Sequence, residues 1–263
     1  MDLRLNGMTA LVTGSTGGIG LAIARTLAVE GAKVTIAGRT QAKLDQAAAS
    51  IRAAGGAHVS AVLADAATAE GAATLLEATP FVDILVNNLG VYEIKDFVQI
   101  TDEDWRRYFE VNVLGGIRLA RAYLPGMLRK NSGRIIFISS ESGFVTPGAM
   151  IHYGMTKTAQ LAISRGLAEM TKGTHVTVNS VLPGPTRSEG IVDFLRSLAR
   201  DPQAPTERIE AEFFAKGRPS SLLQRLIEPE EIASLVAYLA SPLSSATNGA
   251  ALRVDGGVIP TLG

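Results

Sequence analysis

Short runs of β-branched and other apolar residues alternate along the chain with longer amphipathic stretches rich in Ala and Leu. Several short runs are apolar without interruption, as in Ile135-Ile136-Phe137-Ile138, which is typical of parallel strands covered on both faces. An alternation of this kind predicts βαβ units, and therefore a doubly wound α/β fold. The predicted strands are Thr9–Thr13, Lys33–Ala37, His58–Leu63, Asp83–Asn87, Gly133–Ser139, His175–Val181 and Ala250–Val254.

The longer stretches predict the helices between these strands. Thr101 with Asp104 resembles a capping box, and Pro229 suits the first turn of a helix. The chain shows no internal repeat and no low-complexity linker, so we expect residues 1–263 to form one Rossmann-like domain, with about seven strands and helices on both faces of the sheet. The predicted helices lie near Gly18–Glu30, Gln41–Ala54, Ala69–Ala78, Asp102–Arg129, His152–Lys172 and Glu228–Leu239.

One stretch, Ser188–Leu226, does not follow the alternation of short apolar runs and amphipathic helices. It contains three prolines and a mixture of polar and aromatic residues. Right-handed crossovers place a segment that follows the sixth strand over the carboxyl edge of the sheet, where ligands bind in such folds. We therefore expect a substrate lid here rather than a second domain. The candidate apolar contacts to a substrate are Ile191, Phe194, Leu195, Phe213 and Phe214, and the candidate anion contacts are Arg187, Arg218 and Arg225.

Composition narrows the class of protein. The chain has no cysteine, which excludes disulfides, thiolate nucleophiles and cysteine-ligated metals, and its three histidines show no metal-binding spacing. Lys and Arg together number 25, as do Asp and Glu, so the zero net charge gives no global attraction to nucleic acid or to an anionic membrane. The sequence shows no signal peptide and no apolar run of roughly 18 residues. We expect a cytoplasmic protein with no metal, nucleic-acid or membrane partner.

A glycine-rich turn, Thr13–Gly20, lies directly between the first predicted strand and the first predicted helix. Glycines at such a turn let the backbone approach a pyrophosphate, and the helix N-terminus offers unpaired N–H groups to it. The alternative is a loop whose glycines only turn the chain; its place within a βαβ unit favours dinucleotide binding. The candidate cofactor contacts from this turn are Gly14, Ser15, Thr16, Gly18, Ile19 and Gly20.

The residues at the end of the second predicted strand indicate which dinucleotide the protein binds. An acidic residue there would accept hydrogen bonds from the ribose of NAD and repel a 2′-phosphate, but the chain has Arg39 and Thr40 and reaches no carboxylate before Asp45. A guanidinium group and a hydroxyl suit a phosphate. We therefore predict NADP, with two alternatives: that Arg39 stacks on the adenine or lies in solvent, and that the cofactor is NAD.

The candidate chemistry lies in the middle of the chain. Tyr153-Gly-Met-Thr-Lys157 resembles the Tyr-x-x-x-Lys signature of the short-chain dehydrogenase/reductase family, in particular its 3-oxoacyl-carrier-protein reductases. Ser140 precedes the tyrosine by thirteen residues, and Asn112 follows Glu110 and Val111, both as in that family. The ordered set is far more specific than a single Tyr-x-x-x-Lys, and it spans about Leu5 to Gly257. Its other members are Thr13–Gly20, Asn87–Gly90, Pro183-Gly184 and Val254–Gly257.

The resemblance implies an oxidoreductase whose catalytic residues are Asn112, Ser140, Tyr153 and Lys157, with Asn112 anchoring a water that passes protons to Lys157. It implies a homo-oligomer, a dimer or tetramer built on the two long helices. Small residues on these helices would permit close approach of a second subunit, although the buried core of a monomer would look similar: Gly115, Gly116, Ala159, Ala162 and Gly166. The further cofactor contacts that it implies are Asp65, Asn88, Gly90, Tyr153, Lys157, Pro183, Gly184, Thr186 and Ser188.

The chemistry of these side chains agrees with the resemblance. Tyr153 and Lys157 are four residues apart on a predicted helix, so they share one face. A free phenol titrates near ~10, and a neighbouring ammonium is expected to lower that pKa toward the range of a useful acid or base. Ser140 can hold the substrate oxygen beside the phenol, whereas His152 is rotated by about 100° from Tyr153 along the helix and is expected outside the site.

These residues predict hydride transfer between a nicotinamide and a carbonyl or alcohol substrate, with an NADPH-dependent ketone or 3-oxoacyl reductase favoured. One alternative is a dinucleotide-binding sensor or scaffold without catalysis; another is an epimerase or dehydratase, which would need a larger carboxyl-terminal substrate domain. The chain departs from the family at Leu89, where alanine is usual, and at Ser188, where threonine is usual. Leu89 either alters packing beside the cofactor or fills space.

Overall fold

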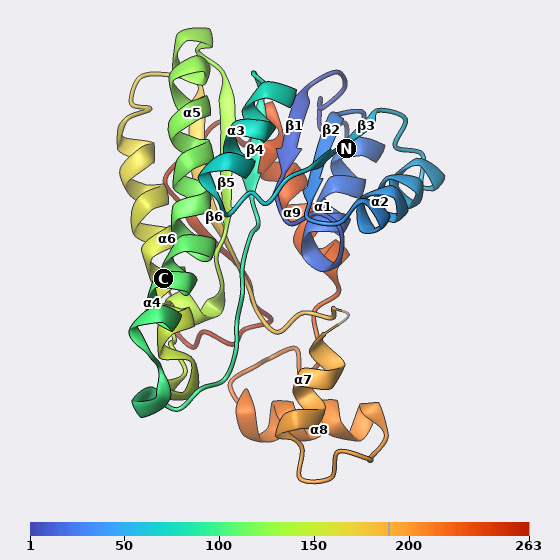
Figure 1. Ribbon diagram of the computed structural model, residues 1–263, viewed down its shortest axis with the longest axis vertical. Helices are drawn as coiled ribbons and strands as arrows, with labels where there is room; N and C mark the ends of the chain where they lie inside the picture. The colour runs from blue at the N-terminus through green and yellow to red at the C-terminus, as the bar shows by residue number, and fades with distance from the viewer. Residues whose placement is uncertain (189, 263) are drawn as a thin grey trace.

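Seven parallel strands form one sheet in the order β3-β2-β1-β4-β5-β6-β7 (Figure 1). The direction of winding reverses between β1 and β4, and in folds of this type the crevice at the carboxyl ends of the strands, at that point, binds ligands. The computed structural model describes residues 1–188 and 190–262 and confirms the predicted fold class. The strands are β1 Thr9–Val12, β2 Lys33–Gly38, β3 Val59–Leu63, β4 Ile84–Asn87, β5 Gly133–Ile138, β6 Val176–Pro183 and β7 Ala251–Val254.

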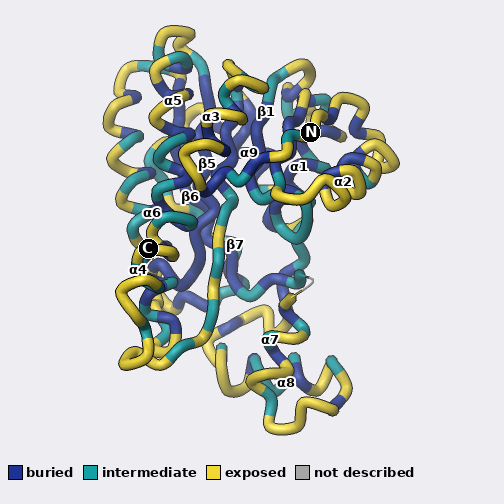
Figure 2. The backbone as a smooth tube through the Cα atoms, in the orientation of Figure 1, coloured by how far each residue is buried: buried dark blue, intermediate teal, exposed yellow. Residues whose placement is uncertain are grey.

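Helices cover both faces of the sheet. One apolar core lies between the sheet and α1, α2 and α9, and a second lies between the sheet and α3, α5 and α6. Figure 2 shows the strands as the most deeply buried part of the chain. No helix among the described residues is long and apolar enough to cross a membrane. The α-helices are α1 Gly18–Val29, α2 Gln41–Ala53, α3 Ala69–Ala78, α4 Asp102–Phe109, α5 Gly115–Lys130, α6 Ile151–Glu169, α7 Ile191–Leu198, α8 Thr206–Gly217 and α9 Pro229–Ala240.

The helix predicted over Asp102–Arg129 is interrupted. A π-helical turn, Glu110–Leu114, lies between α4 and α5 and brings Asn112 to the interior of the protein. Turns of this kind widen a helix locally and occur mostly at functional sites. At the start of α4, Thr101 and Asp104 form the predicted capping box.

The segment after β6 folds into two helices that the sequence did not predict. Figure 1 shows α7 and α8 set apart from the main body, beyond the carboxyl ends of the strands. Their apolar side chains form a cluster of their own, separate from the two cores beside the sheet. Residue 189, within the predicted lid, lies outside the described residues. The cluster consists of Ile191, Leu195, Ala204, Ile209, Phe214 and Leu226.

The small residues expected at a subunit contact divide into two groups. A Cβ atom at Gly115 would lie 3.0 Å from the carbonyl oxygen of Ala66, and one at Gly116 would lie 3.1 Å from the Phe137 ring, so both glycines pack inside the protomer. The expectation was wrong for these two, because they bring α5 close to its own sheet. Ala162 and Gly166, in contrast, lie on the exposed face of α6.

Candidate active site

The glycine turn forms the floor of a groove at the switch point of the sheet. Gly14 and Gly18 have φ angles of 59° and 50°, which residues with side chains rarely adopt. A Cβ at Gly20 would lie 2.2 Å from the Gly14 carbonyl oxygen, so the turn is too tight for any other residue. The Asn88 amide donates to the carbonyl oxygens of Thr13 and Gly14, both at 3.1 Å, and thereby fixes the turn.

This groove has the features that a dinucleotide needs. The first turn of α1 carries only uncharged residues, so its N–H groups and its positive dipole end face the groove without a competing carboxylate. Arg39 lines the far end of the groove. Its side chain is exposed and forms no ion pair with another described residue. The residues present therefore fit a pyrophosphate and a further phosphate. Other predicted residues that line the groove are Thr16, Ile19, Asp65, Asn88, Gly90 and Ser188.

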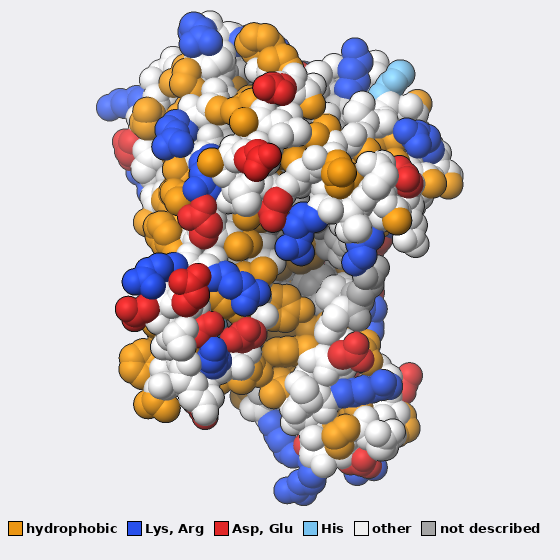
Figure 3. All heavy atoms as spheres, in the orientation of Figure 1, with side chains coloured by type: hydrophobic (Ala, Val, Ile, Leu, Met, Phe, Trp, Pro, Cys, Tyr) orange, Lys and Arg blue, Asp and Glu red, His pale blue; other side chains and the backbone are white. Residues whose placement is uncertain are grey.

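A second pocket continues this groove toward the lid. The two share Ile19, Asn88, Gly90, Tyr92 and Ser188, so a molecule in the groove would extend into the pocket. Figure 3 shows hydrophobic side chains gathered where the surface is hollowed between the sheet and α7–α8. The predicted lid residues Ile191, Phe194, Phe213 and Arg218 line the pocket, together with Pro183, Gly184 and Thr186.

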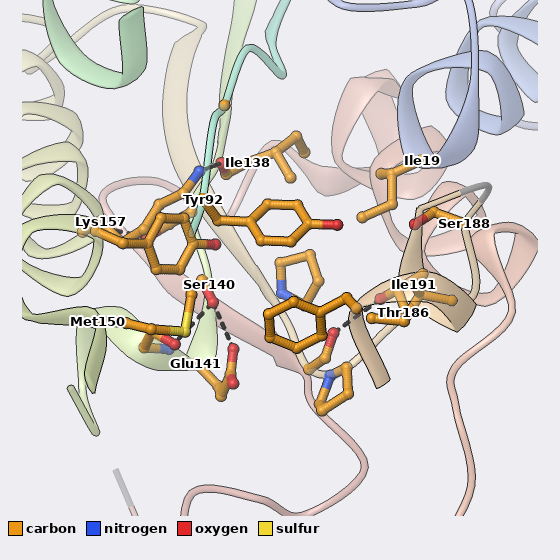
Figure 4. A pocket seen from close by; sticks show the side chains of 18 of the residues that line it. Ile19, Tyr92, Ile138, Ser140, Glu141, Met150, Lys157, Thr186, Ser188 and Ile191 are labelled. Atoms are coloured by element: carbon orange, nitrogen blue, oxygen red, sulfur yellow. Dashed lines mark hydrogen bonds between the residues drawn. The ribbon is translucent and has the colours of Figure 1, made fainter. Parts of the chain in front are cut away.

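Ser140, Tyr153 and Lys157 all line this pocket. Figure 4 shows Ser140 and Lys157 on the same side of it. Ser140 lies just beyond β5, and the other two lie one turn apart on α6, as predicted. Tyr153 and Ser140 both line this pocket, and the Ser140 hydroxyl donates to Glu141 Oε2. The Lys157 Nζ atom lies 5.6 Å from the centre of the Tyr153 ring and donates to the Ile138 carbonyl oxygen at 3.0 Å.

The electrostatics of the pair differ from the expectation. Burial raises the pKa of Tyr153, the negative charge of Glu141 raises it further, and Ser140 acts in the opposite direction. Lys157 is not among the groups that shift the pKa of Tyr153, and its Nζ donates to the Ile138 carbonyl. Burial also lowers the pKa of Lys157 to about 8, against which Glu141 acts. Tyr153 is therefore held protonated at neutral pH, which suits a proton donor.

Asn112 is placed by three hydrogen bonds of its side chain. Its Oδ1 accepts from the Val91 N–H at 2.8 Å, and its Nδ2 donates to the Val91 carbonyl and to Thr156 Oγ1, each at 3.0 Å. Its own carbonyl accepts from Gln160, whose Oε1 lies 3.4 Å from Lys157 Nζ. Gln160 thus joins the backbone of Asn112 to Lys157, and the water that the resemblance implies stays a prediction.

Several predicted contacts lie elsewhere. Ser15 is fully buried beneath the turn, where it donates to the Val12 carbonyl and accepts from the Ala37 N–H, so it joins β1 to β2. Thr40 is the exposed residue before α2 and does not line the groove. Leu89 fills the space between the glycine turn and α5. His152 is buried against Tyr108, with ring centres 4.1 Å apart, and lies outside both pockets, as expected.

Four lid residues were also assigned to the wrong environment, and one of them, Leu195, is buried in the cluster of the lid itself. Arg187 pairs with Glu210 and Glu228 and so joins α8 to α9. Arg225 pairs with Glu231, and neither arginine lines the pocket. Phe214 is buried within the cluster of the lid itself, because its position on α8 turns it away from the pocket that the adjacent Phe213 lines.

Sequence reasoning missed Glu141, Tyr92 and Gln160. Glu141 directly follows Ser140, is only 6 % exposed, and pairs with Arg218 of the lid at 3.2 Å. Its one sequence signal was a charged residue next to the candidate catalytic serine. Tyr92 packs edge to face on Tyr153, with ring centres 6.2 Å apart. Among the described residues, no group of three His, Asp or Glu side chains is arranged to hold a metal ion.

Comparison with known proteins places this site in context. Residues 8–196 match the model of the short chain dehydrogenase family. The uncharacterized oxidoreductase YvaG of Bacillus subtilis is 51 % identical over 263 residues, which cover 98 % of each chain. The 3-oxoacyl-[acyl-carrier-protein] reductase FabG of Escherichia coli is 35 % identical, over 97 % of this chain and 99 % of that one. The structure of L-sorbose reductase from Gluconobacter frateurii, complexed with NADPH and L-sorbose, is 32 % identical and superposes over the whole of both chains with a TM-score of 0.93.

Proposed function

Because the chain belongs to the short-chain dehydrogenase family, whose members are NAD(P)-dependent oxidoreductases acting on CH–OH or C=O groups, we propose that it is an NADPH-dependent ketone reductase. The observation that carries the proposal is the meeting of Ser140, Tyr153 and Lys157 in a pocket continuous with the glycine-turn groove. The relatives do not agree on a substrate, since one is named for 3-oxoacyl groups and another for L-sorbose.

In this proposal the chain's own residues bind, orient and protonate. The glycine turn and the start of α1 hold the pyrophosphate. Gly90 leaves room beside Lys157, because a Cβ atom at Gly90 would lie 3.4 Å from Lys157 Nζ. The Ser140 hydroxyl donates to the carbonyl oxygen and holds it next to the Tyr153 hydroxyl. Tyr153 gives its proton to that oxygen, and the Lys157 ammonium stabilises the phenolate that remains. A bound nicotinamide supplies the hydride.

In the reducing direction Tyr153 acts as the proton donor. A phenol that stays protonated at neutral pH is a donor, whereas alcohol oxidation requires it to act as a base. Lid residues from α7 and α8 exclude water from the pocket in the same proposal. The proposal also includes a cytoplasmic location, which the cysteine-free composition fits.

The test is consumption of NADPH in the presence of a panel of carbonyl compounds that includes small ketones, ketoses and 3-oxoacyl thioesters. We expect turnover with at least one ketone, and a net loss of NADPH that matches the alcohol formed. Tight NADPH binding with no turnover across the panel would instead support a sensor or scaffold. Substrate conversion without net loss of NADPH would support an epimerase or dehydratase.

Arg39 is proposed to pair with the 2′-phosphate of NADP. A charge-assisted hydrogen bond contributes roughly 1.5–3 kcal/mol, so Arg39→Asp should weaken NADP binding by about tenfold to a hundredfold while NAD binding changes little. Dissociation constants of both cofactors measure this. Lys43→Asp makes the same charge change on the nearby surface of α2, does not line the groove, and should keep the wild-type preference. Wild-type protein that binds NAD at least as tightly as NADP would contradict the assignment.

The chain is also proposed to form a dimer or tetramer through the exposed face of α6. Ala162 and Gly166 lie on this face, and a Cβ at Gly166 would meet no atom within 4 Å of its own protomer. Sedimentation should therefore give at least twice the single-chain mass of 27.6 kDa. Gly166→Glu, which the monomer tolerates sterically, should shift the mass toward that of one chain. A wild-type protein that sediments as a monomer at micromolar concentration would exclude this assembly.

A further inference from the structure

A buried carboxylate lies beside the catalytic serine, and the proposed reduction does not use it. Glu141 lines the same pocket as Ser140 and Tyr153, and its side chain is 7 % exposed (Figure 4). Its Oε1 pairs with Arg218 of the lid at 3.2 Å, and its Oε2 accepts a hydrogen bond from the Ser140 hydroxyl. A carboxylate can only accept hydrogen bonds.

The hydrogen bonds of Ser140 create a conflict that a substrate must resolve. A serine hydroxyl can donate one hydrogen bond, and in this structure Ser140 donates it to Glu141. The Ser140 oxygen accepts a hydrogen bond from the Ser142 N–H at 3.1 Å. To donate to a substrate carbonyl, Ser140 must release Glu141 Oε2. That oxygen would then lie buried without a donor, and an unsatisfied buried acceptor carries a large penalty.

A second donor on the substrate would remove this penalty. Ser140 and Glu141 are consecutive residues facing one pocket, so a group that reaches Glu141 while the carbonyl oxygen sits at Ser140 must be close to that carbonyl. A hydroxyl on the adjacent carbon meets this condition, and a methyl or methylene group there does not. Resting on the proposed reductase function, we propose that Glu141 is a specificity-determining residue that selects ketones with a hydroxyl on the carbon next to the carbonyl.

Arg218 has a supporting part in this arrangement. It follows α8, stacks over the Phe213 ring with its guanidinium carbon 5.8 Å from the ring centre, and pairs with Glu141 at 3.2 Å. The ion pair thus holds Glu141 Oε1 and leaves Oε2 to Ser140. The charged and titratable groups that face Glu141 are Arg218 from the lid and Tyr153 and Lys157 from α6.

The experiment compares hydroxyacetone with butanone, two ketones of nearly equal size that differ by a hydroxyl in place of a methyl group. With NADPH, wild-type kcat/KM for hydroxyacetone should exceed that for butanone by more than the intrinsic difference in reactivity. Glu141→Leu removes the hydrogen-bond acceptor, so the ratio of the two kcat/KM values in this variant reports the intrinsic difference in reactivity. The preference for hydroxyacetone should therefore be about tenfold to a hundredfold smaller in the variant than in the wild type. Glu141→Gln keeps one acceptor oxygen and should lie between the two.

The controls separate specificity from general damage. Met150→Leu alters the apolar lining of the same pocket and should keep the wild-type ratio. A purely structural role for Glu141 would lower kcat/KM for both ketones equally and leave the ratio unchanged, which would overturn the proposal. If Glu141→Leu does not fold, an unchanged ratio in Glu141→Gln has the same force. Wild-type protein that binds NADPH but reduces no carbonyl compound would instead overturn the reductase function, and this proposal with it.

Discussion

Replacing Tyr153 with Phe should lower kcat for ketone reduction by about 10²–10⁴-fold, because it removes the hydroxyl that is proposed to protonate the carbonyl oxygen. The fold should survive the change. The ring keeps its edge-to-face contact with Tyr92 and its contact with the Lys157 ammonium, which do not depend on the hydroxyl. Steady-state rates with NADPH, together with the thermal unfolding midpoint, measure both expectations.

Tyr108→Phe is the matched control for this substitution. Tyr108 is also buried, and burial also raises the pKa of its phenol, to about 12, but it lines neither the groove nor the substrate pocket. Loss of its hydroxyl should change kcat by no more than a few-fold. Equal losses in the two variants would mean that the effect of Tyr153 comes from packing rather than from proton transfer.

Replacing Lys157 with Met should lower kcat and also weaken NADPH binding. In the proposed mechanism the ammonium stabilises the phenolate and also reaches the nicotinamide ribose, so the substitution removes both interactions. Loss of a hydrogen bond from a charged donor corresponds to about tenfold to a hundredfold in the dissociation constant, and kcat should fall by a further ~10²-fold. Fluorescence titration with NADPH measures cofactor binding, and steady-state rates measure catalysis. Unchanged affinity for NADPH would mean that Lys157 acts in catalysis but not in cofactor binding.

The same variant should reveal the burial of Lys157 in the absence of any ligand. Burial lowers the pKa of this side chain from 10.5 to about 8, so between those values the unfolded chain binds more protons than the folded one. Wild-type stability relative to Lys157→Met should therefore increase as the pH rises from about 8 toward 10.5, and it should be lowest, and constant, below pH 8. Unfolding midpoints of the two proteins across this range test the sign, and a constant difference would contradict it.

Sequence patterns were sufficient for the sheet and for most of the site. Continuous apolar runs such as Ile135–Ile138 are buried on both faces, and a strand of that kind is recognisable without tertiary information. The spacing of Tyr153 and Lys157 on one helix and the position of Ser140 after a strand follow from local rules, and the structure brings all three together. The tight packing at Gly20 agrees with its place in the first turn of α1, directly after the glycine turn.

The remaining features depend on contacts between distant residues. The π-helical turn at Asn112 has no local signature, and it is stabilised by Val91 and Thr156 from other elements. The helices α7 and α8 are short, and their burial comes from packing on each other. Ser15 was misassigned because sequence gives the position of a residue in a turn but not the direction of its side chain.

Glu141 is the clearest example of this limit. Its importance comes from Arg218, which lies 77 residues away along the chain and meets it through the fold of the lid. Arg187 and Arg225 lie in or beside the same segment but pair with glutamates outside the pocket. Which arginine of a polar segment reaches a site is therefore a property of its tertiary structure.

Transfer of a labelled hydrogen to product tests the central claim most directly. Wild-type protein, Tyr153→Phe and Tyr108→Phe would each be incubated with hydroxyacetone and NADPH that carries deuterium at the transferable position, and the diol formed would be analysed by mass spectrometry. The account predicts one deuterium on the former carbonyl carbon with wild type and Tyr108→Phe, and little or no labelled product with Tyr153→Phe. Labelled product formed by Tyr153→Phe at the wild-type rate would contradict it.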